Sequence, residues 1–440
     1  MAVIRPFRAL RPAPGREEIT AALPYDVYKE REARAYCETH PASFLTLDCP
    51  ETHFPEGTDP SAPEVMRYAR ELFEARKADG AFIREEKPCL YTYSLTMDGR
   101  TQTGLVACSS VDDYRNNVIL KHENTLREKE ENRRLHVGAL SAQTGPIFLA
   151  YRDNDRTRAL MDEAQKAELL CDFVSEDGIR HAVRRISDPE LIRELTEAFG
   201  ALPHTYIADG HHRAASAVRV AVARREAAKA CTPDVSGTAE TGMAGADAIP
   251  EGKSPKVGTA EYDFFLSVLF PARELRIFDY NRVVKDLNGL SPEMFLEALK
   301  TAFLVTYVSE EGNPYRPAKK GEIGLFLNKK WYKLNAKPEI LSEDPREGLD
   351  VSLLQRYVLD PILGIRDPKT DRRIDFVGGI RGLSELERRV NEDMAAAFAM
   401  FPTQMDELFA VADAGCEMPP KSTWFEPKLR SGLLIHEFER

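Results

Sequence analysis

The sequence predicts an α/β (α+β) protein whose sheet is mixed, with parallel and antiparallel neighbours. Short apolar segments alternate with longer helical patterns between residues 118 and 230, which is typical of strands that alternate with helices. A β-hairpin pattern at residues 90–111 contributes antiparallel pairs that a purely parallel sheet lacks. The 440 residues are enough for two or three domains with ample cores.

The hairpin is the clearest local element. Residues 90–96 alternate apolar and polar side chains, Asp98 and Gly99 provide the turn, and residues 101–111 continue as a second extended segment. The elements expected after it are a strand at 118–120, a helix at 125–140, a strand at 146–151, a helix at 158–170, a strand at 181–186 and a helix at 188–199.

Residues 230–260 separate an N-terminal α/β region (1–229) from a C-terminal α/β region (261–440). Small and polar residues dominate this stretch, so we expect a flexible insertion loop, although a loop of this length can also cover a site. The elements expected in the C-terminal region are strands at 264–270, 275–279, 303–308, 324–327 and 331–334, a helix at 292–302 capped by Ser291, and helices with short turns from residue 350 onward.

Composition narrows the possible functions. A net charge of -11 argues against broad, non-specific binding of nucleic acid, which depends on Lys and Arg that neutralise phosphates. Seven cysteines without a Cys-x-x-Cys pair predict reduced thiols. No segment approaches the ~20 apolar residues that a membrane span needs. We therefore expect a cytoplasmic protein without a nucleic-acid or membrane partner, and leave its number of subunits open.

One stretch concentrates polar side chains between a strand and a helix. Residues 206–208 are expected to end a buried strand, and residues 214–230 to form a helix. The connecting loop then holds an acid, a glycine, two imidazoles and a guanidinium, which are Asp209, Gly210, His211, His212 and Arg213.

This combination indicates phosphate chemistry. Gly210 permits a tight turn or a close approach to a ligand, and the start of the helix attracts anions through its amides and its dipole. His211, His212 and Arg213 add donors, while Asp209 can hold a divalent metal or accept a proton. The alternative is a capped helix in which Asp209 bonds the turn and the histidines are solvated.

A second polar loop follows the strand expected at 118–120. Glu123 and His122 are candidate acid or base groups, and Lys121 is a candidate partner for phosphate. The alternative is that Asn124 or Thr125 caps a solvated, charge-rich helix.

Two further patterns are less specific. Asp26 follows a proline and a tyrosine, where an aspartate often bonds its own turn. Near the C-terminus, Lys421 and Lys428 lie among prolines and aromatic residues and are candidates for a phosphate-binding wall. The same segment can equally be a rigid strap that packs Trp424 and Phe425 onto a core.

The common nucleotide-binding and hydrolase signatures are missing from the sequence. There is no Gly-x-x-x-x-Gly-Lys-Ser/Thr loop and no Gly-x-Gly-x-x-Gly after a strand. A Gly-x-Ser-x-Gly elbow and a His-Glu-x-x-His motif are missing too. A standard P-loop or dinucleotide-binding fold is therefore not expected.

Taken together, the motifs resemble those of the domain of unknown function 1015 family over nearly the whole chain, with the 230–260 loop as an addition. The motifs are Pro24-Tyr25-Asp26-Val27, Lys121-His122-Glu123-Asn124-Thr125, Ala208-Asp209-Gly210-His211-His212-Arg213 and the stretch from Pro419 to Leu433. The third motif also resembles the loop of archaeal free-serine kinases, which are grouped with ParB-like and sulfiredoxin-like proteins that bind nucleotide phosphates at such a junction.

The resemblance implies a ParB/serine-kinase-like catalytic core that phosphorylates the hydroxyl of free L-serine, with ATP, ADP or pyrophosphate as donor and Mg²⁺ as cofactor. It places Asp209 beside the hydroxyl or the Mg²⁺, and His211, His212 and Arg213 on the donor phosphates. Glu123 is then the second acid, and either carboxylate can be the base. Two alternatives remain: a nucleotide-binding switch or adaptor without kinase activity, and a phosphohydrolase that uses water as acceptor.

Overall fold

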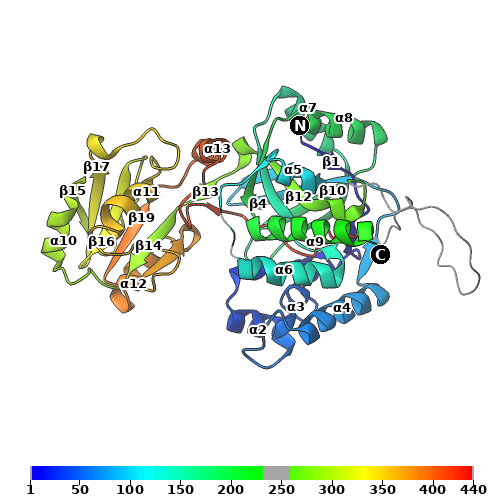
Figure 1. Ribbon diagram of the computed structural model, residues 1–440, viewed down its shortest axis with the longest axis horizontal. Coiled ribbons are helices and arrows are strands. Elements are labelled where there is room, and N and C mark those ends of the chain that lie inside the picture. Colours follow the sequence, from blue (N-terminus) through cyan, green and yellow to red (C-terminus); the bar gives the residue numbers. More distant parts are fainter. Residues whose placement is uncertain (1, 124, 126, 231–257, 439–440) are drawn as a thin grey trace, which may run out of the picture. The chain divides into compact units, whose positions relative to one another are not determined.

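The computed structural model describes residues 2–123, 125, 127–230 and 258–438 (Figure 1). The chain divides into two compact units. The first comprises Met1–Ile119, Thr125–Glu274 and Pro427–Arg440, and the second comprises Leu120–Asn124 and Leu275–Glu426. The boundary between the units thus lies after Glu274 instead of at the predicted 230–260 loop, and the last residues return to the first unit. Of that loop, residues 231–257 lie outside the described residues.

A mixed sheet of nine strands forms the centre of the first unit. Its strands are β1 (Ile4–Arg5), β4 (Leu90–Met97), β5 (Arg100–Ser110), β6 (Ile119–Leu120), β8 (Ile147–Tyr151), β9 (Glu168–Val174), β10 (Arg180–Ile186), β11 (Thr205–Asp209) and β12 (Phe264–Pro271). The order is β6-β11-β8-β12-β5-β4-β10-β9, with β1 paired to β5. β8 and β12 are parallel, whereas β4 and β5 are antiparallel, which confirms the predicted mixed sheet.

The predicted hairpin is confirmed. β4 and β5 are joined by Asp98 and Gly99, whose φ angles are 51° and 74°. Glycine adopts such angles readily and aspartate tolerates them, and a two-residue turn with positive φ matches the twist of the two strands. The local sequence therefore sets the register of the centre of the sheet.

Helices of the first unit cover this sheet and build a second, N-terminal core. They are α1 (Glu17–Thr20), α2 (Glu30–Thr39), α3 (Leu45–Asp48), α4 (Pro63–Ala78), α5 (Val111–Arg115), α6 (Arg127–Leu140), α7 (Asp155–Ala164), α8 (Pro189–Gly200) and α9 (His211–Ala230). α9 turns three small residues, Ala214, Ala217 and Ala221, into the core shared with the strands. α6 lies beside α9 (Figure 1). Phe44 and Phe73 anchor the N-terminal core.

The predicted helix at 158–170 is partly wrong. α7 begins earlier, at Asp155, and ends at Ala164, and the following segment forms strand β9, which pairs with β10 at an edge of the sheet. The apolar run Leu169-Leu170-Cys171 suits either a helix or a strand by its period. In the structure this segment pairs with β10 and is therefore a strand.

The second unit is organised around a six-stranded sheet in which every pair of neighbours is antiparallel. Its strands are β14 (Tyr280–Val284), β15 (Phe303–Glu310), β16 (Glu322–Leu327), β17 (Lys330–Ala336), β18 (Ile374–Gly378) and β19 (Ala396–Met400), in the order β15-β17-β16-β19-β14-β18. β13 (Ile277–Phe278) pairs separately with β20 (Trp424–Phe425). The helices are α10 (Pro292–Leu299), α11 (Asp350–Leu354), α12 (Ser384–Glu392) and α13 (Met405–Asp413).

Two sequence predictions can be compared with this unit. Ser291 caps α10 as predicted, since its Oγ accepts a hydrogen bond from Met294 N at 3.2 Å. The expectation of helices alone from residue 350 onward is wrong, because β18 and β19 belong to the sheet. β19 is a run of five buried apolar residues, and such a short run is ambiguous in sequence until its partner strands are known.

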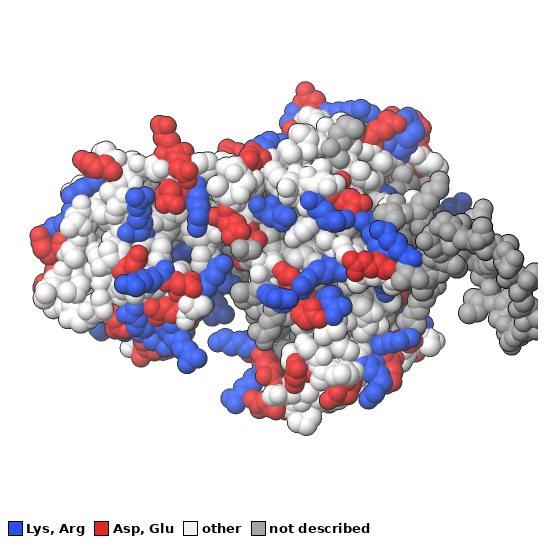
Figure 2. Space-filling view, in the orientation of Figure 1, with Lys and Arg blue, Asp and Glu red and all other residues white. Residues whose placement is uncertain are grey.

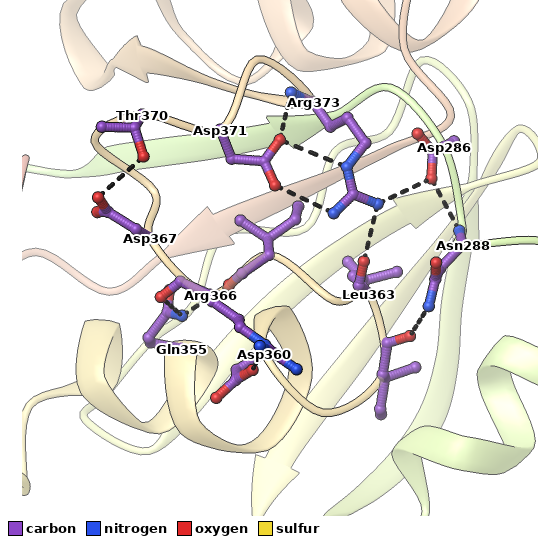
Figure 3. Close-up of polar contacts among 12 residues, drawn as sticks. Asp286, Asn288, Gln355, Asp360, Leu363, Arg366, Asp367, Thr370, Asp371 and Arg373 are labelled. Atoms are coloured by element: carbon purple, nitrogen blue, oxygen red, sulfur yellow. Dashed lines mark hydrogen bonds and ion pairs between the residues drawn. The ribbon is translucent and has the colours of Figure 1, made fainter.

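A loop between α11 and β18 is fixed by its own ion pairs (Figure 3). Arg373 donates to Asp371 Oδ2 at 3.0 Å and to the carbonyl oxygen of Leu363 at 3.0 Å, and it lies 3.5 Å from Asp286 Oδ1. These contacts hold the loop against the end of β14. The acidic side chains that contact Arg373 therefore have a structural use.

Charged side chains of both signs are interspersed on the face shown in Figure 2, over each of the two units. None of the helices in the described ranges combines the length and apolar character that crossing a bilayer requires.

Candidate functional site

The site begins where β11 passes into α9. β11 ends at Asp209, Gly210 turns the chain with a φ of +90°, and α9 starts at His211. The first intrahelical bond runs from Ala214 N to Gly210 O at 2.9 Å. The prediction that the histidines and Arg213 lie on a loop is therefore wrong, because these residues already form the first turn of the helix.

Asp209 forms an ion pair with a residue that lies far away in the sequence. Lys428 Nζ donates to Asp209 Oδ2 at 2.7 Å, and the amide of Gly210 donates to Oδ1 at 2.7 Å. Both side chains are largely buried, with 14% of Lys428 and 29% of Asp209 exposed. The C-terminal segment thus brings a cation to the end of β11. Its use in a phosphate-binding wall stays a prediction.

The electrostatics of this pair keep Asp209 ionised. Burial alone disfavours the charged carboxylate and raises its pKa, but Lys428, Arg213 and the amide of Gly210 outweigh burial and hold the pKa of Asp209 below its usual range. A carboxylate with a lowered pKa is a weak base at neutral pH. In the structure its contact is with the ammonium group of Lys428 and the amide of Gly210.

Arg213 lies over the turn at Gly210. A Cβ at Gly210 would meet Arg213 Nε at 3.2 Å, so the missing side chain makes room for the guanidinium. Arg213 Nη1 donates to Pro146 O at 2.8 Å. A Cβ at Gly145 would lie 3.2 Å from the same nitrogen and 2.9 Å from Ser431 Oγ. Two glycines therefore allow the guanidinium to approach the backbone on both sides.

A small cavity of about 30 Å³ adjoins Arg213, large enough for about one water molecule. Arg133 and Tyr25 also line it, and the guanidinium of Arg133 lies 3.8 Å from the centre of the Tyr25 ring. Burial raises the pKa of Tyr25 to about 12, although Arg133 opposes the shift. Asp48 Oδ1 accepts a hydrogen bond from Thr144 Oγ1 at 3.0 Å in the same wall. The cavity is therefore lined by two arginines, Arg133 and Arg213, and by the acid Asp48.

The other predicted site residues of the first unit are His211, His212 and Asp26. His211 is buried and His212 is partly buried, both in the first turn of α9. Asp26 is exposed on the single helical turn Tyr25–Val27, and its neighbour Tyr25 lines the cavity.

Four predicted residues, Lys121, His122, Glu123 and Lys421, belong to the second unit. His122 is buried, and its carbonyl oxygen accepts a hydrogen bond from Met418 N at 2.8 Å, while Glu123 is exposed. Lys421 has a φ of 59°, and its Nζ lies 5.6 Å from the centre of the Tyr280 ring. Asn124 lies outside the described residues. The roles of this group remain predictions from sequence.

Sequence reasoning missed several residues of the cavity wall. Arg133 lies on a helix with many charged residues, and nothing in the local pattern separates it from solvated arginines. Thr144 precedes Gly145 and Asp48 ends α3, and neither stands in a recognisable motif. Ser431 lies in the C-terminal motif from Pro419 to Leu433, in which only the lysines were predicted as site residues. These residues meet only because the fold brings distant segments together, and a local sequence motif cannot show this.

The predicted Mg²⁺ ligand Asp209 fits a metal poorly. The ammonium of Lys428 lies 2.7 Å from Oδ2, so a second cation on that oxygen would be repelled. Among the described residues, no group of three or more His, Cys, Asp or Glu side chains is placed to hold a metal ion. Phosphate-transferring proteins commonly bind Mg²⁺ through the substrate phosphates with one or two carboxylates. Mg²⁺ therefore stays a prediction that depends on the donor.

Comparison with known proteins finds one family model. It is described as a protein of unknown function (DUF1015) and matches residues 4–352. No curated protein matches the chain.

Several solved structures are similar at low identity. A free serine kinase variant in complex with AMP is 13% identical, with a TM-score of 0.35 over 75% of this chain and 92% of the other. A conserved hypothetical protein from Pyrococcus furiosus is 13% identical, with a TM-score of 0.31 over 74% and 94%. SbnI from Staphylococcus aureus, truncated at its C-terminus, is 11% identical, with a TM-score of 0.35 over 73% and 82%.

Proposed function

The chain belongs to the family of unknown function DUF1015, and we propose that it is a small-molecule kinase. The reaction we propose transfers a phosphoryl group from a nucleotide or pyrophosphate to the hydroxyl of free L-serine and gives O-phosphoserine. The observation that carries the proposal is the Asp209–Lys428 ion pair at the start of α9, with Arg213 in the first turn of that helix. Lys428 and Arg213 supply fixed positive charge where a strand passes into a helix.

Phosphoryl transfer suits this arrangement. The reaction passes through a loose transition state in which most of the catalysis comes from positioning and from neutralising charge on the phosphoryl oxygens. We assign Arg213, Lys428 and the start of α9 to the donor phosphates. Asp209 then keeps Lys428 oriented, and it carries the negative charge that offsets part of this positive cluster. His211 and His212 are assigned to the donor as well.

The identity of the proton acceptor is a separate question. The lowered pKa of Asp209 favours a positioning role over that of a base at neutral pH. Glu123 is the other predicted acid, and it is exposed in the second unit. A loose transition state gives the acceptor hydroxyl little need for early deprotonation, so the proposal does not depend on this assignment.

A turnover assay tests the proposal. The purified full-length protein is incubated with L-serine, Mg²⁺ and ATP, ADP or pyrophosphate in turn, and phosphoserine and phosphate are measured by ³¹P NMR. We expect phosphoserine with at least one donor. Release of phosphate that does not require serine would instead support a phosphohydrolase, and donor binding without turnover would support a nucleotide-binding switch.

The Arg213→Lys and Arg213→Met variants separate charge from geometry. We expect Arg213→Met to lower kcat about a hundredfold, because an arginine on a transferring phosphoryl group contributes at least this much in related chemistry. Arg213→Lys should recover only part of the rate, since lysine lacks the planar pair of donors. Equal activity in all three proteins would remove Arg213 from the mechanism.

A further inference from the structure

A second and larger cavity lies in the first unit, away from Arg213. Its volume is about 350 Å³, within the range of pockets that bind small organic molecules. α1, α2, the turn at 175–177 between β9 and β10, and Arg430 of the C-terminal segment form its walls. It shares no lining residue with the small cavity beside Arg213. The proposed kinase chemistry leaves this cavity without a use.

Arg430 is the fixed cation of the cavity. The residue is only 5% exposed, and its Nη2 donates to Ser175 Oγ at 3.1 Å and to Asp177 Oδ2 at 2.5 Å. Its Nε approaches His181 Nε2 at 3.4 Å. Its hydrogen bonds to the described residues use Nε and Nη2 and leave Nη1 to the ligand. A buried guanidinium that is held on one side and lines a cavity is suited to receive a carboxylate from a ligand.

The cavity also contains groups that attract a cation. Three acids line it, Glu18, Glu176 and Asp177, and Asp177 is paired with Arg430. Glu18 lines it from the first turn of α1, is exposed, and forms no ion pair with the described residues. Two tyrosine rings, Tyr28 and Tyr36, lie with their centres 5.5 Å apart. Tyr36 also stacks on His40 at 4.0 Å with an interplanar angle of 9°, which holds its ring in place. An ammonium group is stabilised both by a carboxylate and by aromatic faces.

We propose that this cavity binds a free α-amino acid. The carboxylate of the ligand pairs with Arg430, the ammonium group pairs with Glu18, and the side chain packs against Tyr28 and Tyr36. The volume admits a side chain larger than that of serine, and the two tyrosine rings favour an apolar or aromatic one. The inference rests on the cavity alone and does not require the proposed kinase activity.

Calorimetric titration of the full-length protein tests the charge requirement. L-leucine, L-methionine, L-phenylalanine and L-tryptophan are titrated singly, each beside its methyl ester and its N-acetyl derivative. We expect at least one free amino acid to bind, and the loss of either charge to weaken binding about tenfold or more. Failure of all four at millimolar concentration, or equal binding of the ester or the acetyl derivative, would overturn the proposal.

Two variants locate the binding. Glu18→Gln and Tyr36→Ala should each weaken the titrated amino acid about tenfold, with circular dichroism used to verify that the fold is retained. Glu64→Gln is the matched control, because Glu64 is likewise an exposed acid in the first turn of a helix, α4, and lies outside the cavity. Unchanged affinity in both cavity variants, or an equal loss in Glu64→Gln, would place the amino acid elsewhere.

Discussion

At the scale of single residues, the site is a small set of charges that hold one another in place. Asp209 fixes Lys428, while Arg213 lies over Gly210 and bonds to Pro146. Each partner is mostly buried, so the loss of one leaves the other charge poorly compensated. Stability and activity should therefore respond together to changes at this pair.

Removal of the lysine tests this coupling. Lys428→Met leaves Asp209 partly buried without its ammonium partner, and we expect the free energy of unfolding to fall by about 2 kcal/mol. Urea denaturation measures the change. Lys166→Met is the matched control, because Lys166 pairs with Glu163 at 2.6 Å on the surface, where 72% of the lysine side chain is exposed. The account is contradicted if both variants lose the same stability.

The buried histidine His181 predicts how stability depends on pH. Burial, with Arg430 nearby, lowers the pKa of His181 from 6.5 to about 3. Below pH 6.5 the unfolded chain therefore binds a proton on this imidazole, whereas the folded chain binds it only near pH 3. The contribution of His181 to the free energy of unfolding is fully present above pH 6.5 and is lost as the pH falls toward 3. The expected loss is about 1.4 kcal/mol per pH unit for this group.

Unfolding by urea at pH 7.5, 6.5 and 5.5 measures this slope. Other buried histidines contribute in the same direction, because burial also lowers the pKa of His136, to about 4, and that of His436. In the His181→Asn variant, the free energy of unfolding should therefore depend on pH less steeply, by about 1.4 kcal/mol per pH unit, which corresponds to one proton. An identical slope in the variant and the parent would show that His181 is protonated in the folded protein.

At the scale of elements, the junction between β11 and α9 depends on Gly210. The Gly210→Ala variant combines an unfavourable φ of +90° with a Cβ at 3.2–3.3 Å from the guanidinium of Arg213. The guanidinium is the flexible end of its side chain and can move away. We therefore expect a loss of about 1 kcal/mol from the backbone, together with at least a tenfold fall in kcat from the displaced Arg213.

Gly178→Ala isolates the backbone effect. Gly178 has a similar φ of +78°, but a Cβ there would meet no atom within 4 Å. Urea denaturation and steady-state kinetics of both variants should show a similar loss of stability and a loss of kcat in Gly210→Ala alone. If Gly210→Ala retained full activity, catalysis would not depend on the position of Arg213, and the prediction would be wrong.

The elements differ in how well the sequence predicts them. The hairpin follows from the alternation of residues 90–96 and the turn pair Asp98-Gly99, both of which are local signals. The β11 to α9 junction follows from the apolar strand and the glycine, although the helix begins three residues earlier than predicted. By contrast, β9 and β19 depend on neighbouring strands, and their own residues do not distinguish strand from helix.

The contacts of the site were only partly predictable for a related reason. Asp209, Gly210 and Arg213 stand together in one motif, whereas Lys428 is 219 residues away from Asp209 in the sequence. The local sequence around Lys428 predicts it as a candidate site residue, but it does not predict that Asp209 is its partner. Arg133 stands in no motif, and its place in the cavity wall depends on which segments lie side by side in the fold.

At the scale of the whole molecule, the chain leaves the first unit after Glu274 and returns at Pro427. Backbone hydrogen bonds join the returning segment to other parts of the first unit. Ser431 N donates to Ala22 O at 2.8 Å, Gly432 N to Thr144 O at 2.9 Å, and Ile435 N to Leu10 O at 2.9 Å. β21 (His436–Glu437) then pairs with β7 (Ala142–Gln143). The final residues thus complete the first unit and carry Lys428 and Arg430 to their positions.

The Gly432→Ala variant tests this docking. Gly432 has a φ of +81°, and a Cβ there would lie 2.4 Å from the buried ring of Phe44. We expect a loss of about 3 kcal/mol or more, since the ring lies in a packed core and has little room to move. Differential scanning calorimetry compares it with Gly415→Ala, whose φ is +66° but whose Cβ would be free of contacts. Equal shifts in Tm would mean that the segment is not tightly docked.

The most direct test of the central claim is the position of a bound phosphate donor. A crystal structure of the protein with pyrophosphate, or with the nucleotide that supports turnover, locates the phosphates. The account predicts phosphate oxygens in hydrogen-bond contact with Arg213 and Lys428 at the first turn of α9. A donor bound elsewhere, with Asp209, Lys428 and Arg213 making no contact to it, would contradict the account.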